Sequence, residues 1–247
     1  GVPEVLLQGE GEVGPHHGVA PGFLSSGKPV LEWHSDGLYD SATPSAATSM
    51  YSLSLKRVGG DTGFMDGAAI YDTLPPAERA VADATQVQYS RVPRPMHPSG
   101  LRAALPGDGD GAADGGGGLG ALYSGSEAVG EIEGAACHPV VWVHPATGRR
   151  ALMASPMWTR HLVGAGGAAL GDEASQRQLE AWLRRGAVTE YFHRWALGDF
   201  VVWDNRRLYH TATPNSGFSA EGTRLLHRVR LKGPDPPVAP SAGQCNA

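Results

Sequence analysis

Hydrophobic and polar positions alternate over short stretches of the chain, and this pattern predicts a fold built mainly from β-strands. Residues 48–57 alternate most clearly: apolar side chains such as Tyr51 occupy one face of the expected strand, and polar side chains such as Ser52 occupy the other. We therefore expect this segment to be a half-buried strand whose apolar face contacts the core.

The same reasoning predicts several other strands. The runs 140–143 and 151–154 flank a glycine-containing turn, which indicates a hairpin. Further expected strands are 188–195, 199–203, 208–213 and 223–231.

Three segments are typical of helices. Residues 66–74 and 76–88 are separated by a proline pair that breaks the helical pattern. Residues 175–185 begin with a capping box, in which Ser175 is followed three positions later by a glutamine, and Gly186 is expected to end the helix. The sum is mainly β with a few flanking helices, which indicates a sandwich or a jelly roll.

The composition agrees with one folded domain over residues 1–247. The hydrophobic share is 41%, which is enough for a core, although Gly and Pro are abundant, at 35 and 19 of 247 residues. Much of that excess lies in residues 93–134, which we expect to be a flexible Gly/Pro/Asp-rich insert. A tolerated insertion is the main interpretation of this segment, and a substrate lid is the alternative.

The net charge of −5 predicts no nucleic-acid partner and no acidic membrane surface, and favours a small-molecule substrate. The chain begins with no charged-then-apolar signal pattern and carries no apolar run long enough to span a membrane, so we expect a cytoplasmic protein. Its two cysteines show no zinc-binding spacing. A homo-oligomer is left open.

The strongest chemical signal is the pair His34 and Asp36. Side chains two residues apart on a strand share a face, so an imidazole and a carboxylate would point to the same place. Two histidines and one carboxylate form the facial triad of non-haem Fe(II) oxygenases. His210, on an expected strand after a polar turn, would supply the second histidine, although the first pair alone would also fit a surface turn.

The last expected strand carries a row of arginines. Arg224, Arg228 and Arg230 share one face with Leu226, and the opposite face, with His227, is expected to pack on the core. The arginine face would then line a cavity that binds an anion, or would simply be exposed to solvent.

Five segments together resemble the taurine catabolism dioxygenase family of Fe(II)- and 2-oxoglutarate-dependent oxygenases, which includes taurine, aryloxyacetate and alkylsulfate dioxygenases. The resemblance covers most of residues 3–232 outside the insert. The segments are WHSDGLYD at 33–40, GGDTGFMDGAAIYDTLP at 59–75, HPVVWVHPATGRRALM at 138–153, GDFVVWDNRRLYHTATP at 198–214 and RLLHRVRL at 224–231.

The resemblance implies a double-stranded β-helix (jelly roll, cupin-like) and three iron ligands, His34, Asp36 and His210. It further implies that Thr62 and Arg224 bind a carboxylate of 2-oxoglutarate.

By the same resemblance, three residues would contact the substrate. Arg228 would bind the anionic group of the substrate, and the other two would line the side of the site on which the substrate binds. For the tyrosine, packing alone is an equal alternative. These residues are Arg228, Gly37 and Tyr39.

The implied reaction uses Fe(II), 2-oxoglutarate and O₂ to hydroxylate a small organic acid such as a sulfonate, sulfate ester or aryloxy acid, with release of succinate and CO₂. Two alternatives stay open: a biosynthetic hydroxylase or desaturase of an amino acid or carboxylic acid on the same site, and a non-catalytic metal-binding jelly-roll module. Only 33 residues precede His34, fewer than is usual in the family, so we expect the N-terminal part of the domain to be incomplete.

Overall fold

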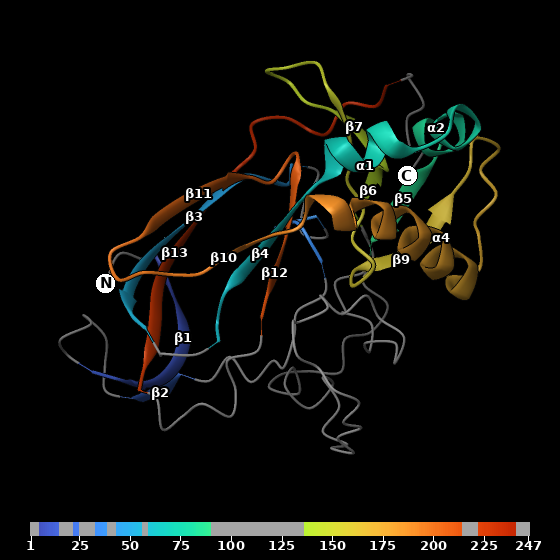
Figure 1. The fold of residues 1–247 in the computed structure, drawn as a ribbon. Helices are drawn as coiled ribbons and strands as arrows, with labels where there is room; N and C mark the ends of the chain where they lie inside the picture. Colours follow the sequence, from blue (N-terminus) through green and yellow to red (C-terminus); the bar gives the residue numbers. More distant parts are fainter. Residues whose placement is uncertain are drawn as a thin grey trace.

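The computed structural model describes seven stretches of the chain, and the predicted insert at 93–134 lies outside them. Figure 1 shows two β-sheets on one side of the molecule and a helix-containing part on the other. The described residues are 5–14, 22–24, 33–38, 43–55, 59–89, 136–213 and 222–240.

The larger sheet has five antiparallel strands and the smaller sheet has three. The order in the larger sheet is β11 (Phe200–Asp204), β3 (Ser45–Ser54), β13 (Arg224–Lys232), β1 (Leu6–Val13) and β2 (Gly22–Leu24). The order in the smaller sheet is β10 (Tyr191–His193), β4 (Thr62–Asp66) and β12 (Leu208–Ala212).

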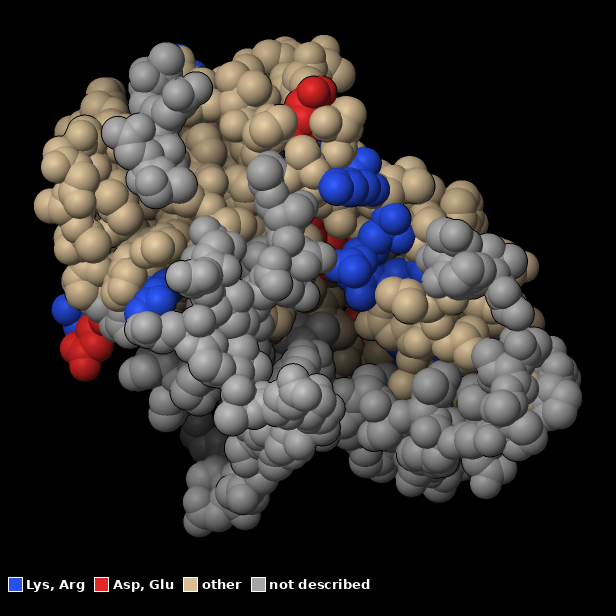
Figure 2. Space-filling model, turned by 180° about the vertical axis from the view of Figure 1, so that it is seen from behind, with Lys and Arg blue, Asp and Glu red and all other residues tan. Residues whose placement is uncertain are grey.

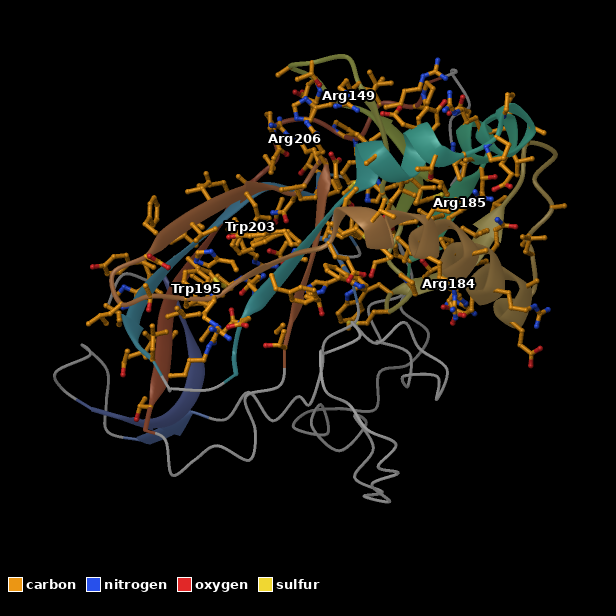
Figure 3. The ribbon with its side chains drawn as sticks, in the orientation of Figure 1. Arg149, Arg184, Arg185, Trp195, Trp203 and Arg206 are labelled. Carbon is orange, nitrogen blue, oxygen red and sulfur yellow. The ribbon has the colours of Figure 1, made fainter. Side chains whose placement is uncertain are left out.

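The two sheets share an apolar core that contains side chains from both. This cluster consists of Met50, Phe64, Trp195, Trp203 and Leu226. Figure 3 shows the two tryptophans among the strands of the two sheets. Two facing antiparallel sheets around one core form a jelly roll, which confirms the predicted fold class.

The structure reverses the expected orientation of β3 and departs in part from that of β13. In β3, Met50 and Ser52 are buried, whereas Tyr51 is 41% exposed on the outer face. In β13, Leu225 and Leu226 are both fully buried, whereas Leu231, which was expected on the core side, is 56% exposed. The interior of the jelly roll accommodates polar groups, so alternation alone pointed to the wrong face.

The helical part places three helices beside two short sheets. The helices are α1 (Gly67–Thr73), α2 (Pro76–Asp83) and α4 (Asp172–Arg184), and α4 is followed by the 3₁₀ helix η2 (Arg185–Thr189). One sheet joins β6 (Cys137–Pro139), β5 (Gln86–Tyr89) and β9 (Thr159–Val163); the other is the predicted hairpin of β7 (Val141–Val143) and β8 (Arg150–Leu152).

Two helical predictions need correction. The helix expected over 76–88 ends at Asp83, because the following residues pair with β6 and β9 as strand β5. Ser175 does not cap α4, since the N-cap is Gly171. The Ser175 hydroxyl instead accepts a hydrogen bond from Leu162 N at 3.0 Å, which ties the helix to β9.

A second, larger apolar cluster lies under these helices and extends to the ligand segment through Trp33. It fixes the helical part against β4, because Met65 of that strand is one of its members. Within the described residues no helix is both long enough and apolar enough to cross a membrane.

Candidate metal and cosubstrate site

His34 and His210 lie side by side at one end of the jelly roll. His34 N donates to His210 O at 3.0 Å, and His210 N donates to His34 O at 2.8 Å, so the 33–38 segment is attached to β12. Their ring centroids are 4.2 Å apart. Because β12 belongs to the smaller sheet, this pairing attaches the ligand segment to that sheet.

Asp36 completes a group of three. One donor atom each from His34, Asp36 and His210 can be chosen so that all lie within 4.8 Å of one another. Asp36 Oδ1 lies 3.7 Å from His210 Nε2, and both side chains are buried. No other group of three His, Cys, Asp or Glu in the described part of the chain is close enough to hold a metal ion.

The protonation states suit a metal ion. Burial alone would raise the pKa of Asp36, but the neighbouring His210 and Arg228 outweigh it and hold the pKa well below the ordinary value. Burial lowers the pKa of His210. A carboxylate and a neutral imidazole are the forms that bind Fe(II). Among the described residues, the buried Nδ1 of His210 has no hydrogen-bond partner.

Two residues near Asp36 were missing from the sequence prediction. Thr48 Oγ1 donates to Asp36 Oδ2 at 2.5 Å, and Asn205 Nδ2 donates to Thr48 Oγ1 at 2.8 Å. Thr48 lies on β3, and Asn205 follows β11 in the turn before β12. Asn205 was recognised only as a turn residue, and a threonine on a strand carries no sequence signal for this role.

Thr62 lies on β4 and its hydroxyl is held by the core. Trp195 Nε1 donates to Thr62 Oγ1 at 3.0 Å, and both residues are buried. An indole N–H can only donate, so the hydroxyl accepts here and retains its own proton for another acceptor. The environment of Thr62 therefore suits it to donate to a carboxylate.

Arg224 is a buried arginine that contacts the segment just before Thr62. Its Nε and Nη2 donate to the carbonyl of Gly60 at 3.1 and 2.7 Å. Burial lowers its pKa to about 10, against an opposing effect of Asp61. Within the described residues no carboxylate forms a salt bridge with this guanidinium, so an anionic ligand would compensate its burial.

The position of the Arg224 guanidinium depends on the absence of a side chain at Gly60. The φ of Gly60 is +78°, and a Cβ at this residue would collide with Nε and Cδ of Arg224. The glycine therefore allows both the turn and the close approach of the guanidinium.

Arg228 contacts the candidate metal site directly. Its Nη2 donates to Asp36 Oδ1, and its buried Nε finds no hydrogen-bond partner in the described part of the chain. Arg230, two residues further along β13, is exposed. The arginine row is thus divided: Arg224 and Arg228 turn into the interior, and Arg230 faces solvent.

Gly37 has a structural reason to be glycine. Its φ is +75°, and a Cβ there would lie 3.0 Å from Ser45 Oγ and 3.1 Å from Ser45 N. The residue forms the turn that follows Asp36 against β3. Tyr39 lies outside the described residues.

Two other histidines pair with carboxylates but form no site of three. His144 Nε2 lies 2.9 Å from Asp204 Oδ2, and His193 Nε2 lies 3.0 Å from Asp199 Oδ2. Each contact holds a strand end or a turn, which gives these histidines a structural role.

Comparison with known proteins was consistent with this geometry. The model of the Taurine catabolism dioxygenase TauD, TfdA family matches residues 8–230. An (S)-phenoxypropionate/alpha-ketoglutarate-dioxygenase of Sphingobium herbicidovorans is 32% identical over 206 residues, covering 82% of this chain and 62% of the relative.

Two further matches extend the comparison. An alpha-ketoglutarate-dependent xanthine dioxygenase of Neurospora crassa is 28% identical over 190 residues, covering 73% of this chain and 42% of the relative. The crystal structure of a putative alpha-ketoglutarate-dependent taurine dioxygenase from Burkholderia xenovorans superposes with a TM-score of 0.64 and 25% identity, over 97% of this chain and 65% of that one. The chain thus spans between about two fifths and two thirds of the length of these proteins.

Proposed function

Because the chain belongs to the taurine catabolism dioxygenase family, we propose that it acts as an Fe(II)- and 2-oxoglutarate-dependent dioxygenase on a small anionic organic molecule. The observation that carries the proposal is the buried group of His34, Asp36 and His210. The reaction would transfer one oxygen atom of O₂ to a C–H carbon of the substrate and the other to 2-oxoglutarate, which loses CO₂ and becomes succinate.

In this proposal His34, Asp36 and His210 hold Fe(II). Three ligands on one side of an octahedral ion leave three positions open, which suits a chelating cosubstrate and O₂. Bound Fe(II) supplies the O₂ chemistry that amino-acid side chains lack. The protein contributes the position and charge of the ligands and the apolar walls that exclude water, among them Trp203, whose ring centroid lies 5.0 Å from that of His210.

The proposed role of Thr62 and Arg224 is to bind the distal carboxylate of 2-oxoglutarate. The hydroxyl of Thr62 can donate its proton because Trp195 occupies it as an acceptor. The guanidinium of Arg224 is buried and positively charged, and a carboxylate is the partner that its planar fork fits best. Arg224 contacts the backbone of Gly60, two residues before Thr62.

Arg228 supports an anionic substrate. It lies at the candidate metal site on the strand that also carries Arg224. A guanidinium in that place would hold a sulfonate, sulfate or carboxylate beside the metal. Figure 2 also shows basic side chains gathered beside a hollow on one face of the molecule. We propose Gly37 as a neighbour of the substrate, while Tyr39 stays a prediction.

Two alternatives predict different outcomes in one assay. The chain is incubated with Fe(II), ascorbate and 2-oxoglutarate and with sulfonates, sulfate esters, aryloxyacetates, amino acids or xanthine, and succinate and products are measured by mass spectrometry. We expect substrate-dependent succinate with an anionic compound that gains one oxygen atom, detected either intact or as the carbonyl compound and the sulfite, sulfate or phenol into which the hydroxylated product breaks. A product that loses two hydrogens instead would identify a desaturase.

A non-catalytic metal-binding module would form no succinate above the level of an Asp36→Ala control with any compound. That result would contradict the proposal, provided that the wild-type chain is folded and binds Fe(II). The one-oxygen product on an amino acid would favour the biosynthetic alternative on the same site.

A further inference from the structure

The two carboxylate oxygens of Asp36 make different contacts in the structure. Oδ2 accepts the hydrogen bond of Thr48 Oγ1 at 2.5 Å. Oδ1 faces the other way, toward Arg228 Nη2 and toward His210 Nε2 at 3.7 Å. The oxygen on the histidine side is thus distinct from the oxygen on the threonine side.

The donor role of Thr48 is fixed by a chain of buried groups. Trp203 Nε1 donates to Asn205 Oδ1 at 3.1 Å, and an indole N–H has no acceptor capacity. The amide oxygen of Asn205 therefore faces the tryptophan, and its NH₂ faces Thr48, to which it donates at 2.8 Å. The threonine hydroxyl, occupied as an acceptor, has one proton left, and that proton points to Asp36.

The same asparagine also holds the backbone of the ligand segment. Its Oδ1 accepts from Asp36 N at 3.5 Å, and its carbonyl oxygen accepts from Ser35 Oγ at 2.7 Å. Asn205 and Thr48 are both fully buried. A network in which each member is satisfied and shielded from water holds one arrangement and excludes others.

From this network we infer that Thr48 is a positioning residue that makes Asp36 bind the metal through Oδ1 alone, with Asn205 and Trp203 holding the hydroxyl in its donor orientation. The inference rests on the proposed function. A carboxylate bound through one oxygen leaves three positions of an octahedral ion open, whereas binding through both oxygens leaves two. A chelating 2-oxoglutarate and O₂ together need three.

The test replaces Thr48 by valine, which has nearly the same shape and lacks the hydroxyl. Thr48→Ser should restore the hydrogen bond. Ser52→Ala is a matched control, because Ser52 lies on the same strand, is 1% exposed and has an Oγ with no hydrogen-bond partner among the described residues. Folding is checked by thermal unfolding, and Thr48→Ala tests the same point if the valine variant does not fold.

The measurement is an anaerobic titration of 2-oxoglutarate into each Fe(II)-loaded variant, followed by the visible charge-transfer absorption of the complex. We expect Thr48→Val to bind Fe(II) within a few-fold of wild type and to give an altered absorption band with 2-oxoglutarate, which still finds two positions. When the complex is then mixed with O₂, which would lack a position, the band should decay at least tenfold more slowly than in wild type. Thr48→Ser and Ser52→Ala should behave as wild type.

A folded Thr48→Val or Thr48→Ala variant with the wild-type absorption band and the wild-type rate of decay in O₂ would overturn the inference. So would an equal loss in Ser52→Ala, since that would show a general effect of altering β3. Failure of the proposed function is separate from both, because wild type itself would then bind no Fe(II) or give no absorption band with 2-oxoglutarate.

Discussion

His34 and His210 are far apart in the sequence and hold each other through two reciprocal backbone hydrogen bonds of 3.0 and 2.8 Å. Such a pair places both side chains on one face and fixes their separation. The candidate metal site therefore does not depend on the side chains alone, since backbone pairing between the 33–38 segment and β12 sets the geometry on which Asp36 then converges.

Removal of the buried guanidinium tests the cosubstrate assignment. In Arg224→Ala we expect the KM for 2-oxoglutarate to rise at least tenfold while Fe(II) binding is retained, because the proposed carboxylate partner is lost and the metal ligands are intact. Arg230→Ala is the control, since that side chain is exposed on the same strand. An unchanged KM in a folded Arg224→Ala variant would remove its proposed role.

Gly60 gives an independent test of the same contact. In Gly60→Ala the new Cβ would displace the Arg224 guanidinium, so we expect a higher KM for 2-oxoglutarate without loss of Fe(II) binding. Gly148→Ala is a matched control: its φ of +66° carries a similar backbone cost, but no atom lies within 4 Å of the new Cβ. Equal KM values in the two variants would show that backbone strain alone matters.

The sequence predicted the strands better than the direction they face. Binary alternation located β3, but it assigned the apolar Tyr51 to the interior, whereas the interior at this end accommodates Thr48 and Ser52. A jelly roll that encloses a polar site buries polar side chains on one face of its strands. The alternation of apolar and polar residues indicates that the two faces of a strand differ. Only the tertiary structure shows which face points into the interior.

The sequence predicted only those residues of the candidate site that belong to short motifs. The pair His34 and Asp36 has side chains that can bind a metal ion, and the arginines of β13 have side chains that can bind an anion. Their residue types alone therefore suggested these roles. Thr48 and Asn205 act through hydrogen bonds between segments distant in sequence. Neither residue type is distinctive on a strand or in a turn, which explains why both were missed.

Gly186 is a test of packing outside the site. A Cβ there would lie 2.5 Å from Met65 Sδ and 2.7 Å from Ile70 Cγ1, so Gly186→Ala should lower the free energy of unfolding by about 1–3 kcal/mol. Gly166→Ala, where nothing lies within 4 Å, should change it by less than about 0.5 kcal/mol. Urea unfolding measures both values, and similar stabilities of the two variants would contradict the packing.

Asp66 predicts a pH dependence of stability. Burial would raise its pKa, but hydrogen bonds from Arg207 and from Ala68 N outweigh this and lower it. The stability due to the ionised group is therefore complete above the unfolded-state pKa of about 3.9 and is lost as the pH falls through the lower folded-state pKa.

Asp66→Asn isolates that charge, because asparagine also caps helices well. We expect wild type to exceed the variant in free energy of unfolding at pH 6–7 and the difference to shrink below about pH 4. Urea unfolding at several pH values measures this. A difference that stays constant down to pH 3 would show that the charge of Asp66 does not stabilise the fold.

The central claim is that His34, Asp36 and His210 hold one metal ion, and anaerobic calorimetric titration of Fe(II) tests it most directly. We predict that wild type and His227→Ala, which alters a histidine on the outer side of β13, each bind one equivalent. His210→Ala should lose at least 100-fold in affinity while keeping the wild-type fold, because a site of three ligands loses one. Wild-type affinity for Fe(II) in a folded His210→Ala variant would contradict the claim.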